Sequence, residues 1–383
     1  MALILARSPF YVNKGNFLDG ATVDVIISYI NGQSATVNLE SYNVVFRGDV
    51  SIDISPFIRD FFTSYEVLEV RVIISGTEGQ GTITETTNHI AIDGYGYYEE
   101  GANKDFTDYL RNDSAFYAGS NDVVYRNRKE PVSIPLLNAS SASSQDTIVT
   151  SFKKGVVQTV KNVDFGFIDS GGNTYLETKE RIQYISDLEF PVSFEDRVSR
   201  ESGVFESKNC YNQYNNLYSS STIDKIVITP NGDSNSEHTI NIIPVCESKY
   251  EPYKLVFTNK LGVREDLWFF KKSTNEITTK REEYKANTVQ DYIAGDLSKH
   301  SYGSYNLNGR EGMNMNTGFI PESFKENIRQ LMLSETVWLE RDGTRLPVTI
   351  KNSQMKLKQS INEKLINYEI EIEFSYDTIN NIS

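Results

Sequence analysis

The sequence predicts a mainly β protein with minor α content, built from sandwich- or barrel-like β domains and a small α+β module at the C-terminal end. The chain holds 23 Tyr and 20 Phe among abundant Val, Ile and Thr, and branched and aromatic side chains fit the pleated surface of a sheet. Short apolar runs bounded by Gly, Asn and Asp recur along the chain, as in all-β domains. The last sixty or so residues combine one amphipathic helix with strictly alternating strands.

The first 138 residues read as one N-terminal β domain. Residues 22–30 are apolar on both faces, which indicates a buried strand. Ser55 and Pro56 precede a short helix over 57–62, with Ser55 as the expected cap. Further strands are expected at 44–46, 50–54, 67–75 and 132–137.

The segment NASSASSQD, residues 138–146, consists of small and polar residues. Residues 139–146 are therefore predicted to form a linker to a middle β domain over 147–318. Two hairpins are expected in this domain, from strands 223–229 with 238–245 and from strands 254–258 with 264–271. Residues 301–318 are rich in Gly and Asn and predict a long irregular loop of the kind that is functional or orders against a partner.

The C-terminal module, 319–383, begins with a helix and continues as two hairpins. Phe324, Ile328 and Leu331 recur at helical spacing and therefore share one face. The Asp342-Gly343 pair predicts a two-residue turn. That turn places Glu340 opposite Arg345 and Leu339 opposite Leu346.

The second hairpin is expected to turn at 362–363, with Leu357 opposite Tyr368. In its last strand one face is apolar and the other acidic, which predicts one buried and one wet or partner-bound face. Lys356 and Lys358 would lie beside the acidic row. That row is either a solvated face or part of a subunit contact or channel wall. The apolar face consists of Tyr368, Ile370, Ile372, Phe374 and Tyr376, and the acidic face consists of Glu369, Glu371 and Glu373.

The formal net charge is −14 and the sequence pI about 4.9. This balance argues against a grip on a phosphate backbone, which needs clustered Lys and Arg, although DNA could pass such a surface without specific binding. Cys210 and Cys246 are the only cysteines, so a reducing compartment is expected. The N-terminal apolar run is too short for a signal peptide and no stretch is long enough for a membrane span, so folding in a cytoplasm is expected.

No motif for chemistry stands out, and neither enzymatic activity nor a cofactor or metal is expected. His89, His238 and His300 lack a local nucleophile signature, and the cysteines lack zinc spacing. The oxygen-rich loop 231–237 lacks the EF-hand Gly and Glu. The loop holding Tyr95, Tyr97 and Tyr98 has two interpretations, a stacking platform for a glycan or a packed interface loop.

Residues 248–272 (SKYEPYKLVFTNKLGVREDLWFFKK), the C-terminal block and the opening ARSPFYV resemble structural proteins of tailed bacteriophages. They are similar to neck and tail components of phages that infect Bacteroidetes, including the crAss-like phages. The resemblance implies a virion protein that forms a homo-oligomeric ring or baseplate layer near the portal vertex, beside portal, neck or tail proteins, assembled in the host cytoplasm. It supplies no catalytic residues.

Three functions are compatible with these patterns. The favoured one is a ring subunit in the conduit for genome delivery. The alternative is a tail-tip or fibre-base module that binds host-surface glycan through the tyrosine loop, and a tail-associated glycan hydrolase with a carboxylate pair is less favoured. Trp268 and Trp338 are expected to anchor a core. The expected interface residues are Tyr253, Phe257, Trp268, Phe270, Tyr302, Tyr305, Arg310, Glu369, Glu371 and Glu373.

Overall fold

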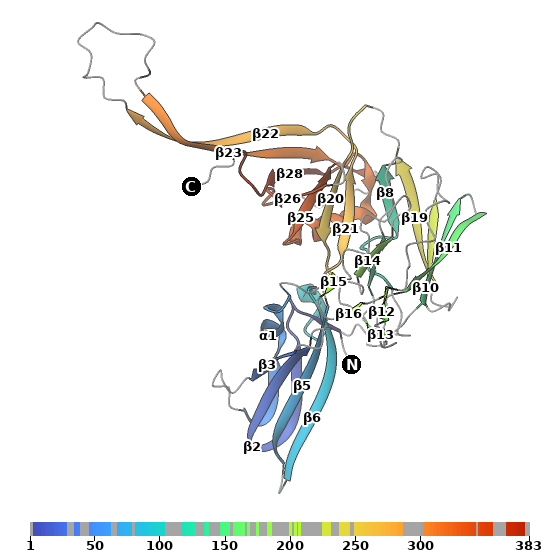
Figure 1. Ribbon diagram of the computed structural model, residues 1–383, viewed down its shortest axis with the longest axis vertical. Coiled ribbons are helices and arrows are strands. Elements are labelled where there is room, and N and C mark those ends of the chain that lie inside the picture. Colours follow the sequence, from blue (N-terminus) through green and yellow to red (C-terminus); the bar gives the residue numbers. More distant parts are fainter. Residues whose placement is uncertain are drawn as a thin grey trace. The chain divides into compact units, whose positions relative to one another are not determined.

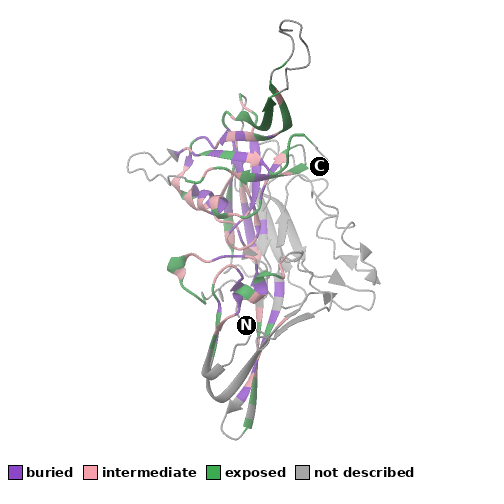
Figure 2. Cartoon of the chain, turned by 90° about the vertical axis from the view of Figure 1, so that its left-hand side faces the viewer, coloured by how far each residue is buried: buried purple, intermediate pink, exposed green. Residues whose placement is uncertain are grey.

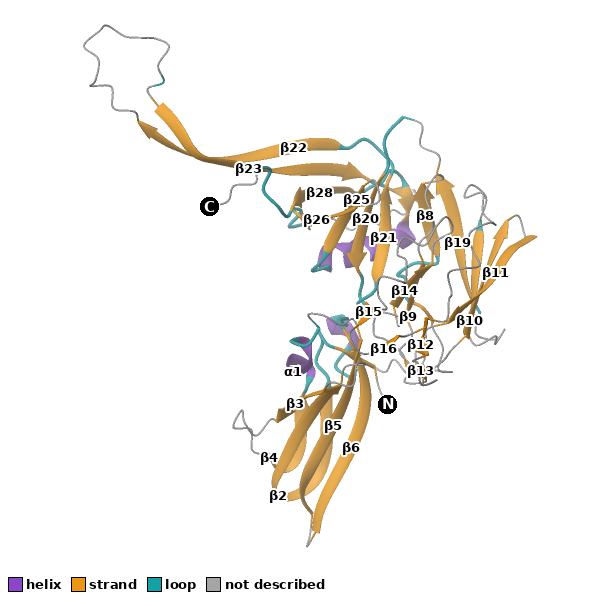
Figure 3. Ribbon diagram, viewed as in Figure 1, coloured by secondary structure: helices purple, strands orange, loops and turns teal. Residues whose placement is uncertain are grey.

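The computed structural model confirms a mainly β chain with minor α content (Figures 1 and 3). Contact clustering divides it into two compact units. Unit 1 comprises Met1–Cys246 and Thr258–Asp266, and unit 2 comprises Glu247–Phe257 and Leu267–Ser383. The expected domain borders near 138 and 318 stay predictions, and most of the expected linker lies outside the described residues. The structure describes residues 3–28, 34–38, 46–62, 67–78, 81–103, 116–127, 134–137, 146–153, 156–164, short strands within 167–207, 224–230, 237–245, 249–285, 300, 302–341, 344–354 and 365–379.

The N-terminal sheet of unit 1 has the strand order β1-β6-β5-β2-β3, and β4 also pairs with β2. The 18-residue β2 is long enough to pair with β4 through its first half and with β3 through its second. The two strands expected around Gly48-Asp49 are one strand, because register shifts in the β2–β4 ladder absorb the irregularity. The bounds are β1 (Leu3–Leu5), β2 (Tyr11–Ser28), β3 (Ser34–Asn38), β4 (Phe46–Asp53), β5 (Val67–Glu78) and β6 (Gly81–Ile92).

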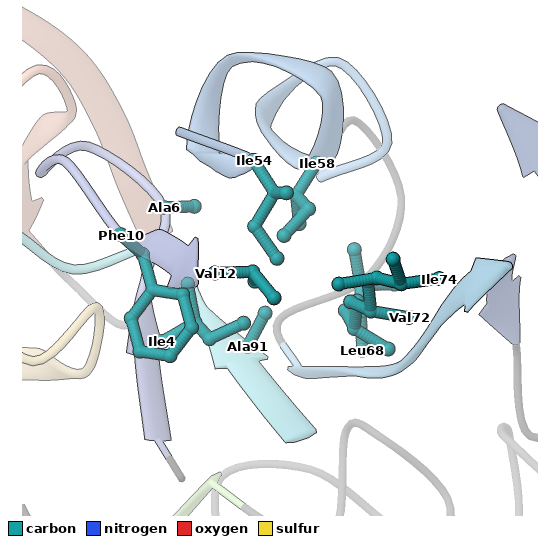
Figure 4. Close-up of a cluster of buried hydrophobic side chains, with 11 residues drawn as sticks. Ile4, Ala6, Phe10, Val12, Ile54, Ile58, Leu68, Val72, Ile74 and Ala91 are labelled. Carbon is teal, nitrogen blue, oxygen red and sulfur yellow. The ribbon is translucent and has the colours of Figure 1, made fainter. Parts of the chain in front are cut away.

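Helix α1 (Ser55–Arg59) closes one end of this sheet, and its N-cap residue Ile54 and its Ile58 are fully buried. They pack into a cluster with Ile4, Leu68, Val72 and their neighbours (Figure 4). The predicted Ser55 cap is wrong. Asp53 Oδ1 instead accepts hydrogen bonds from the Ser55 amide at 3.0 Å and the Ser55 hydroxyl at 2.7 Å, and from the Phe10 amide at 2.9 Å.

The rest of unit 1 consists of further sheets. The largest has the order β11-β10-β18-β19-β8, and its β18–β19 ladder confirms the hairpin predicted on either side of residues 231–237. Smaller ladders join the other short strands. The bounds are β7 (Phe116–Tyr117), β8 (Val123–Asn127), β9 (Ile134–Leu137), β10 (Asp146–Lys153), β11 (Val156–Asp164), β12 (Phe167–Ile168), β13 (Thr174–Tyr175), β14 (Ile182–Ile185), β15 (Ser199–Arg200), β16 (Gly203–Val204), β17 (Glu206–Ser207), β18 (Lys225–Pro230) and β19 (His238–Val245), with the 3-10 turn η2 (Tyr98–Glu100) after β6.

Unit 2 contains a seven-stranded sheet in the order β21-β20-β25-β26-β28-β23-β22. Helix α3 carries the predicted apolar face, since Phe324, Ile328 and Leu331 are all buried. The bounds are β20 (Tyr253–Thr258), β21 (Arg264–Phe269), β22 (Thr274–Lys285), β23 (Tyr302–Asn316), β24 (Ile320–Pro321), η7 (Glu322–Phe324), α3 (Lys325–Leu333), β25 (Val337–Arg341), β26 (Thr344–Ile350), β27 (Leu365–Ile366) and β28 (Glu369–Phe374).

The C-terminal hairpin predicted from Asp342-Gly343 is confirmed in register, because Glu340 pairs with Arg345 and Leu339 with Leu346. The apolar face of the last strand is also confirmed from Tyr368 to Phe374, whose inward side chains are at most 8% exposed, whereas Tyr376 beyond the strand is 46% exposed. The expected turn at 362–363 and Leu357 lie outside the described residues. β28 itself pairs with β26 and β23.

The prediction of an irregular loop over 301–318 is wrong, because residues 302–316 form the long strand β23. Its Gly and Asn content is compatible with a strand for a local reason. A Cβ added to Gly312 would lie 2.9 Å from the Ile372 carbonyl oxygen, so a glycine permits the close β23–β28 approach. Pairing with two neighbouring strands thus overrides the low strand propensity of the segment.

Candidate assembly interface

Strands β22 and β23 form a two-stranded ribbon that projects from the sheet of unit 2 (Figure 1). β28 pairs with β23 only over Gly312–Asn316, so the rest of the ribbon extends past the end of that ladder. We call the described ribbon, Thr274–Lys285 and Tyr302–Asn316, the arm. All twelve residues of β22 are exposed and are drawn in green in Figure 2.

A bulge in β23 interrupts the arm near its middle. Lys280 pairs with Asn308 and Glu282 with Tyr305, so Arg281 faces two residues of β23. Asn306, one of the two, has a φ of 50°, and Asn is the non-glycine residue best able to adopt this left-handed conformation. Such a bulge increases the local twist of the ribbon.

The face of the arm that continues the buried face of the sheet, which we call the core-side face, carries Ile277, Thr279, Leu307 and Gly309. It is defined by alternation from Met313, which is 4% exposed and packed in the core. A Cβ added to Gly309 would lie 3.6 Å from Ile277 Cγ1 and 3.5 Å from Thr279 Cγ2. Gly309 is therefore covered by these side chains and is itself buried, whereas Ile277 and Leu307 are 60% and 48% exposed.

The opposite face, the outer face, carries an aromatic pair. The ring centroids of Tyr284 and Tyr305 lie 5.9 Å apart, and the Tyr284 ring covers Gly303. Both tyrosines remain about half exposed, at 54% and 48%. Exposed apolar side chains thus occupy both faces of the arm.

Charged side chains hold the root of the arm. Arg310 Nε lies 3.0 Å from Asp377 Oδ1, and this hydrogen bond and its charge raise the pKa of Arg310. Lys351 Nζ lies 2.9 Å from Glu373 Oε1 and, with Arg310, lowers the pKa of that carboxyl. The Thr378 amide donates a 2.7 Å hydrogen bond to the Gly309 carbonyl, so the chain after β28 supports β23 beyond the ladder.

The negative charges of the acidic row on β28 are balanced by other residues than the predicted Lys356 and Lys358. Lys356 and Lys358 lie outside the described residues. Lys351 and Arg310 approach Glu373, while Asn316 Nδ2 donates a 3.1 Å hydrogen bond to Glu369. Glu369 and Glu371 are exposed and Glu373 is half-buried, so the row remains an accessible surface.

Four of the predicted interface residues belong to the core of unit 2. Tyr253, Phe257, Trp268 and Phe270 are 8%, 0%, 7% and 4% exposed, which removes them from the predicted contact surface. Trp268 stacks on Phe270 with ring centroids 6.0 Å apart, as expected of a core anchor, whereas Trp338 is half-buried. Sequence alone could not separate these buried aromatics from the exposed Tyr302 and Tyr305.

Strand β22 was not predicted from the sequence. Its residues, TNEITTKREEYK, are mostly charged or polar, and neither a run of apolar residues nor strict alternation marks the strand. The available signal was the branched Ile277, Thr278 and Thr279 followed by Tyr284. Among the residues that the structure describes, five of the thirteen exposed large hydrophobic side chains lie on the arm: Ile277, Tyr284, Tyr302, Tyr305 and Leu307.

The tyrosine loop presents one free ring, not three. Tyr95 is 9% exposed, with the Arg7 guanidinium 4.8 Å from its ring, and Lys260 Nζ lies 4.4 Å from the Tyr97 ring. Lys260 also pairs with Glu100, at 2.6 Å. Tyr98 alone is fully exposed.

The tip of the β20–β21 hairpin, which clusters with unit 1, centres on a buried carboxylate. Glu265 is 6% exposed and accepts hydrogen bonds from the Ser120 hydroxyl at 2.6 Å, the Ser120 amide at 3.1 Å and Asn259 Nδ2 at 3.1 Å. Burial raises the pKa of Glu265, and the three donors oppose that shift. Burial likewise raises the pKa of the neighbouring Tyr117.

The histidines are dispersed. Burial lowers the pKa of His89 to about 4, and its ring packs edge-on against Phe10 at 5.3 Å. His238 stacks on Tyr117 and lies 2.9 Å from Asp122, and His300 is exposed. Within the described ranges no three His, Cys, Asp or Glu side chains gather as metal ligands, and Cys210 and Cys246 fall outside those ranges.

Comparison with protein-family models and with curated proteins finds no match to this chain. No helix in the part of the chain that the structure describes is long and apolar enough to cross a membrane.

Proposed function

We propose that this chain is a structural subunit that assembles with copies of itself into a ring through the arm, in the neck or tail of a tailed phage particle. The observation that carries the proposal is the projecting arm, whose edge strand is exposed along all twelve residues. An isolated two-stranded ribbon is at best marginally stable in water, so an arm of this length gains most when a neighbouring subunit covers it. The placement in a phage rests on the sequence resemblance.

The size of the arm bears on how tightly such subunits would associate. Twelve residues of strand extend about 40 Å, and two strands are about 10 Å wide, so each face offers about 400 Å². One face packed on a similar area buries about 800 Å² in total, which is the size of weak contacts. Assembly through the arm is therefore expected to depend on concentration and to be completed by ring closure.

The charge of the chain agrees with a role around passing DNA. A net charge of −14 would repel a phosphate backbone and let it move without sticking. The glycan-binding alternative draws less support, because Tyr98 is the one fully exposed ring of the tyrosine loop. The described residues offer no feature that favours a hydrolase.

A shortened arm tests the assembly proposal. Residues 280–308 are replaced by an Asn-Gly turn that joins Thr279 to Gly309, which are paired in the ladder. Met313 and Met315 remain in place, so unit 2 is expected to fold. Light scattering should show concentration-dependent oligomers for the full chain and monomers for the shortened one, with equal melting temperatures as the control for folding.

Monomers of the full chain at every concentration would refute the assembly proposal. The phage placement has a separate test, antibody labelling of intact particles. Label at the neck or tail supports the placement, and its absence from purified particles that contain the other structural proteins contradicts it.

A further inference from the structure

We propose that the arms of neighbouring copies stack head to tail, with the outer face of one arm on the core-side face of the next. This inference rests on the proposed function and specifies the contact and the symmetry of the assembly. Its basis is the distribution of apolar and charged groups over the two faces of the arm.

Apolar groups on both faces select the type of symmetry. Tyr284 and Tyr305 project from the outer face, whereas Ile277 and Leu307 are exposed on the core-side face. A two-fold contact would join like faces and leave the other apolar face of each arm in water. A heterologous contact repeated from copy to copy covers both faces of every arm, and such a contact closes into a ring when its rotation permits.

The two faces also differ in the kind of apolar side chain that they present. The aromatic pair is a ridge of two large rings, about half exposed, supported at its base by Gly303. The core-side face instead presents two exposed aliphatic side chains, Ile277 and Leu307. Tyrosine is a frequent anchor at the centre of protein interfaces, and the exposed Ile277 and Leu307 offer an apolar surface for such a ring.

The charges of the arm indicate that the occupant is a second copy. The arm has four acidic and four basic residues, so its net charge is zero in a chain whose net charge is −14. Each face is balanced by itself, because alternation places Glu276, Lys280, Glu282 and Arg310 on the outer face and Arg281, Glu283, Lys285 and Glu311 on the core-side face.

Copies of a strongly acidic protein repel one another over most of their surface, but two arms approach without a net penalty. A nucleic acid or an anionic membrane would instead require an excess of Lys and Arg. The balanced arm therefore suits another arm of the same chain better than either of those partners.

A cysteine scan of the full chain tests the stacking. One cysteine is placed at each position from 276 to 283 in turn, where even numbers lie on the outer face and odd numbers on the core-side face. Every one of these positions is exposed, so the variants are expected to fold. The matched pair Thr278→Cys and Thr279→Cys changes neighbouring residues of one type on opposite faces. The parent chain, oxidised in parallel, gives the background from Cys210 and Cys246.

The expected result is intermolecular disulfides only in mixtures of an even variant with an odd variant. A chain that carries one even and one odd cysteine of a reactive pair should give a ladder of covalent oligomers whose largest member counts the copies in the ring. Disulfides within a single-variant pool, or between two variants of one face, would overturn head-to-tail stacking in favour of a two-fold contact.

Light scattering on the same samples separates the two proposals. Oligomers that form without any even–odd disulfide would overturn the stacking and leave the ring subunit standing. Monomers throughout would overturn both.

Discussion

Replacement of Glu265 tests whether the hairpin tip of unit 1 is held by a buried carboxylate. In Glu265→Ala the Ser120 amide, the Ser120 hydroxyl and Asn259 Nδ2 lose an acceptor inside the protein. Each buried donor left unpaired costs about 1–3 kcal/mol. Because water can re-pair some donors and the cost of burying the carboxylate disappears, we expect a net loss of about 3 kcal/mol from the free energy of unfolding of unit 1.

Glu265→Gln should cost less, since its amide oxygen still accepts from Ser120, and it also isolates the effect of charge. Burial raises the pKa of Glu265 in the folded state, so the folded chain binds this proton more readily than the unfolded chain does. The carboxyl therefore adds stability below its ordinary pKa, and this stability is lost as the pH rises through the folded pKa. The Gln variant should lose that pH dependence.

The assay is denaturant unfolding across a pH series, with hydrogen exchange at the Ser120 amide to report on unit 1 specifically. The exposed Glu99→Gln serves as the matched control. If the Glu265→Ala protein is as stable as the parent and its Ser120 amide is still protected from exchange, the predicted role of Glu265 is refuted. Equal pH slopes for Glu265→Gln and the parent would refute the charge argument alone.

Two further predictions concern pH and the arm. The pKa of His89 is lowered to about 4, so its neutral form stabilises unit 1 above its ordinary pKa. That contribution, at most about 3 kcal/mol before solvent screening, should be lost as the pH falls from about 6.5 toward 4. In His89→Asn the free energy of unfolding should therefore depend less on pH in this range, and an unchanged pH dependence would contradict the lowered pKa of His89. At the bulge, Asn306→Gly should leave the melting temperature of unit 2 nearly unchanged, whereas Asn306→Val should cost about 1–2 kcal/mol because φ is 50°. Equal stability of the two variants would contradict the left-handed conformation of Asn306.

Local patterns predicted the parts of the fold that local physics decides. The Asp342-Gly343 pair in the sequence predicted the register of β25 and β26, and helical spacing identified the buried residues Phe324, Ile328 and Leu331. Strict alternation likewise identified the buried residues of β28. In each case neighbouring residues carry the signal, so no knowledge of distant segments was needed.

The parts that escaped prediction depend on partners far apart in the chain. Gly312 belongs to a strand because Ile372 lies beside it. Ser120 donates a hydrogen bond to Glu265, which lies 145 residues later in the sequence. The N-cap of α1 is Ile54, not Ser55, and Asp53 binds both the Ser55 amide and the distant Phe10 amide. Periodicity cannot report such contacts, and for the same reason Tyr253 and Trp268 resembled surface aromatics until their burial was known.

The division of the chain into two units has an evolutionary consequence. The polypeptide crosses the border between them three times, after Cys246, after Phe257 and after Asp266. A gene fragment that stops at the first crossing would lack Lys260 and Glu265, on which the loops around Glu100 and Ser120 depend. Recombination between related genes at that crossing would therefore separate residues that stabilise one another, and the two halves should be inherited together and diverge in concert.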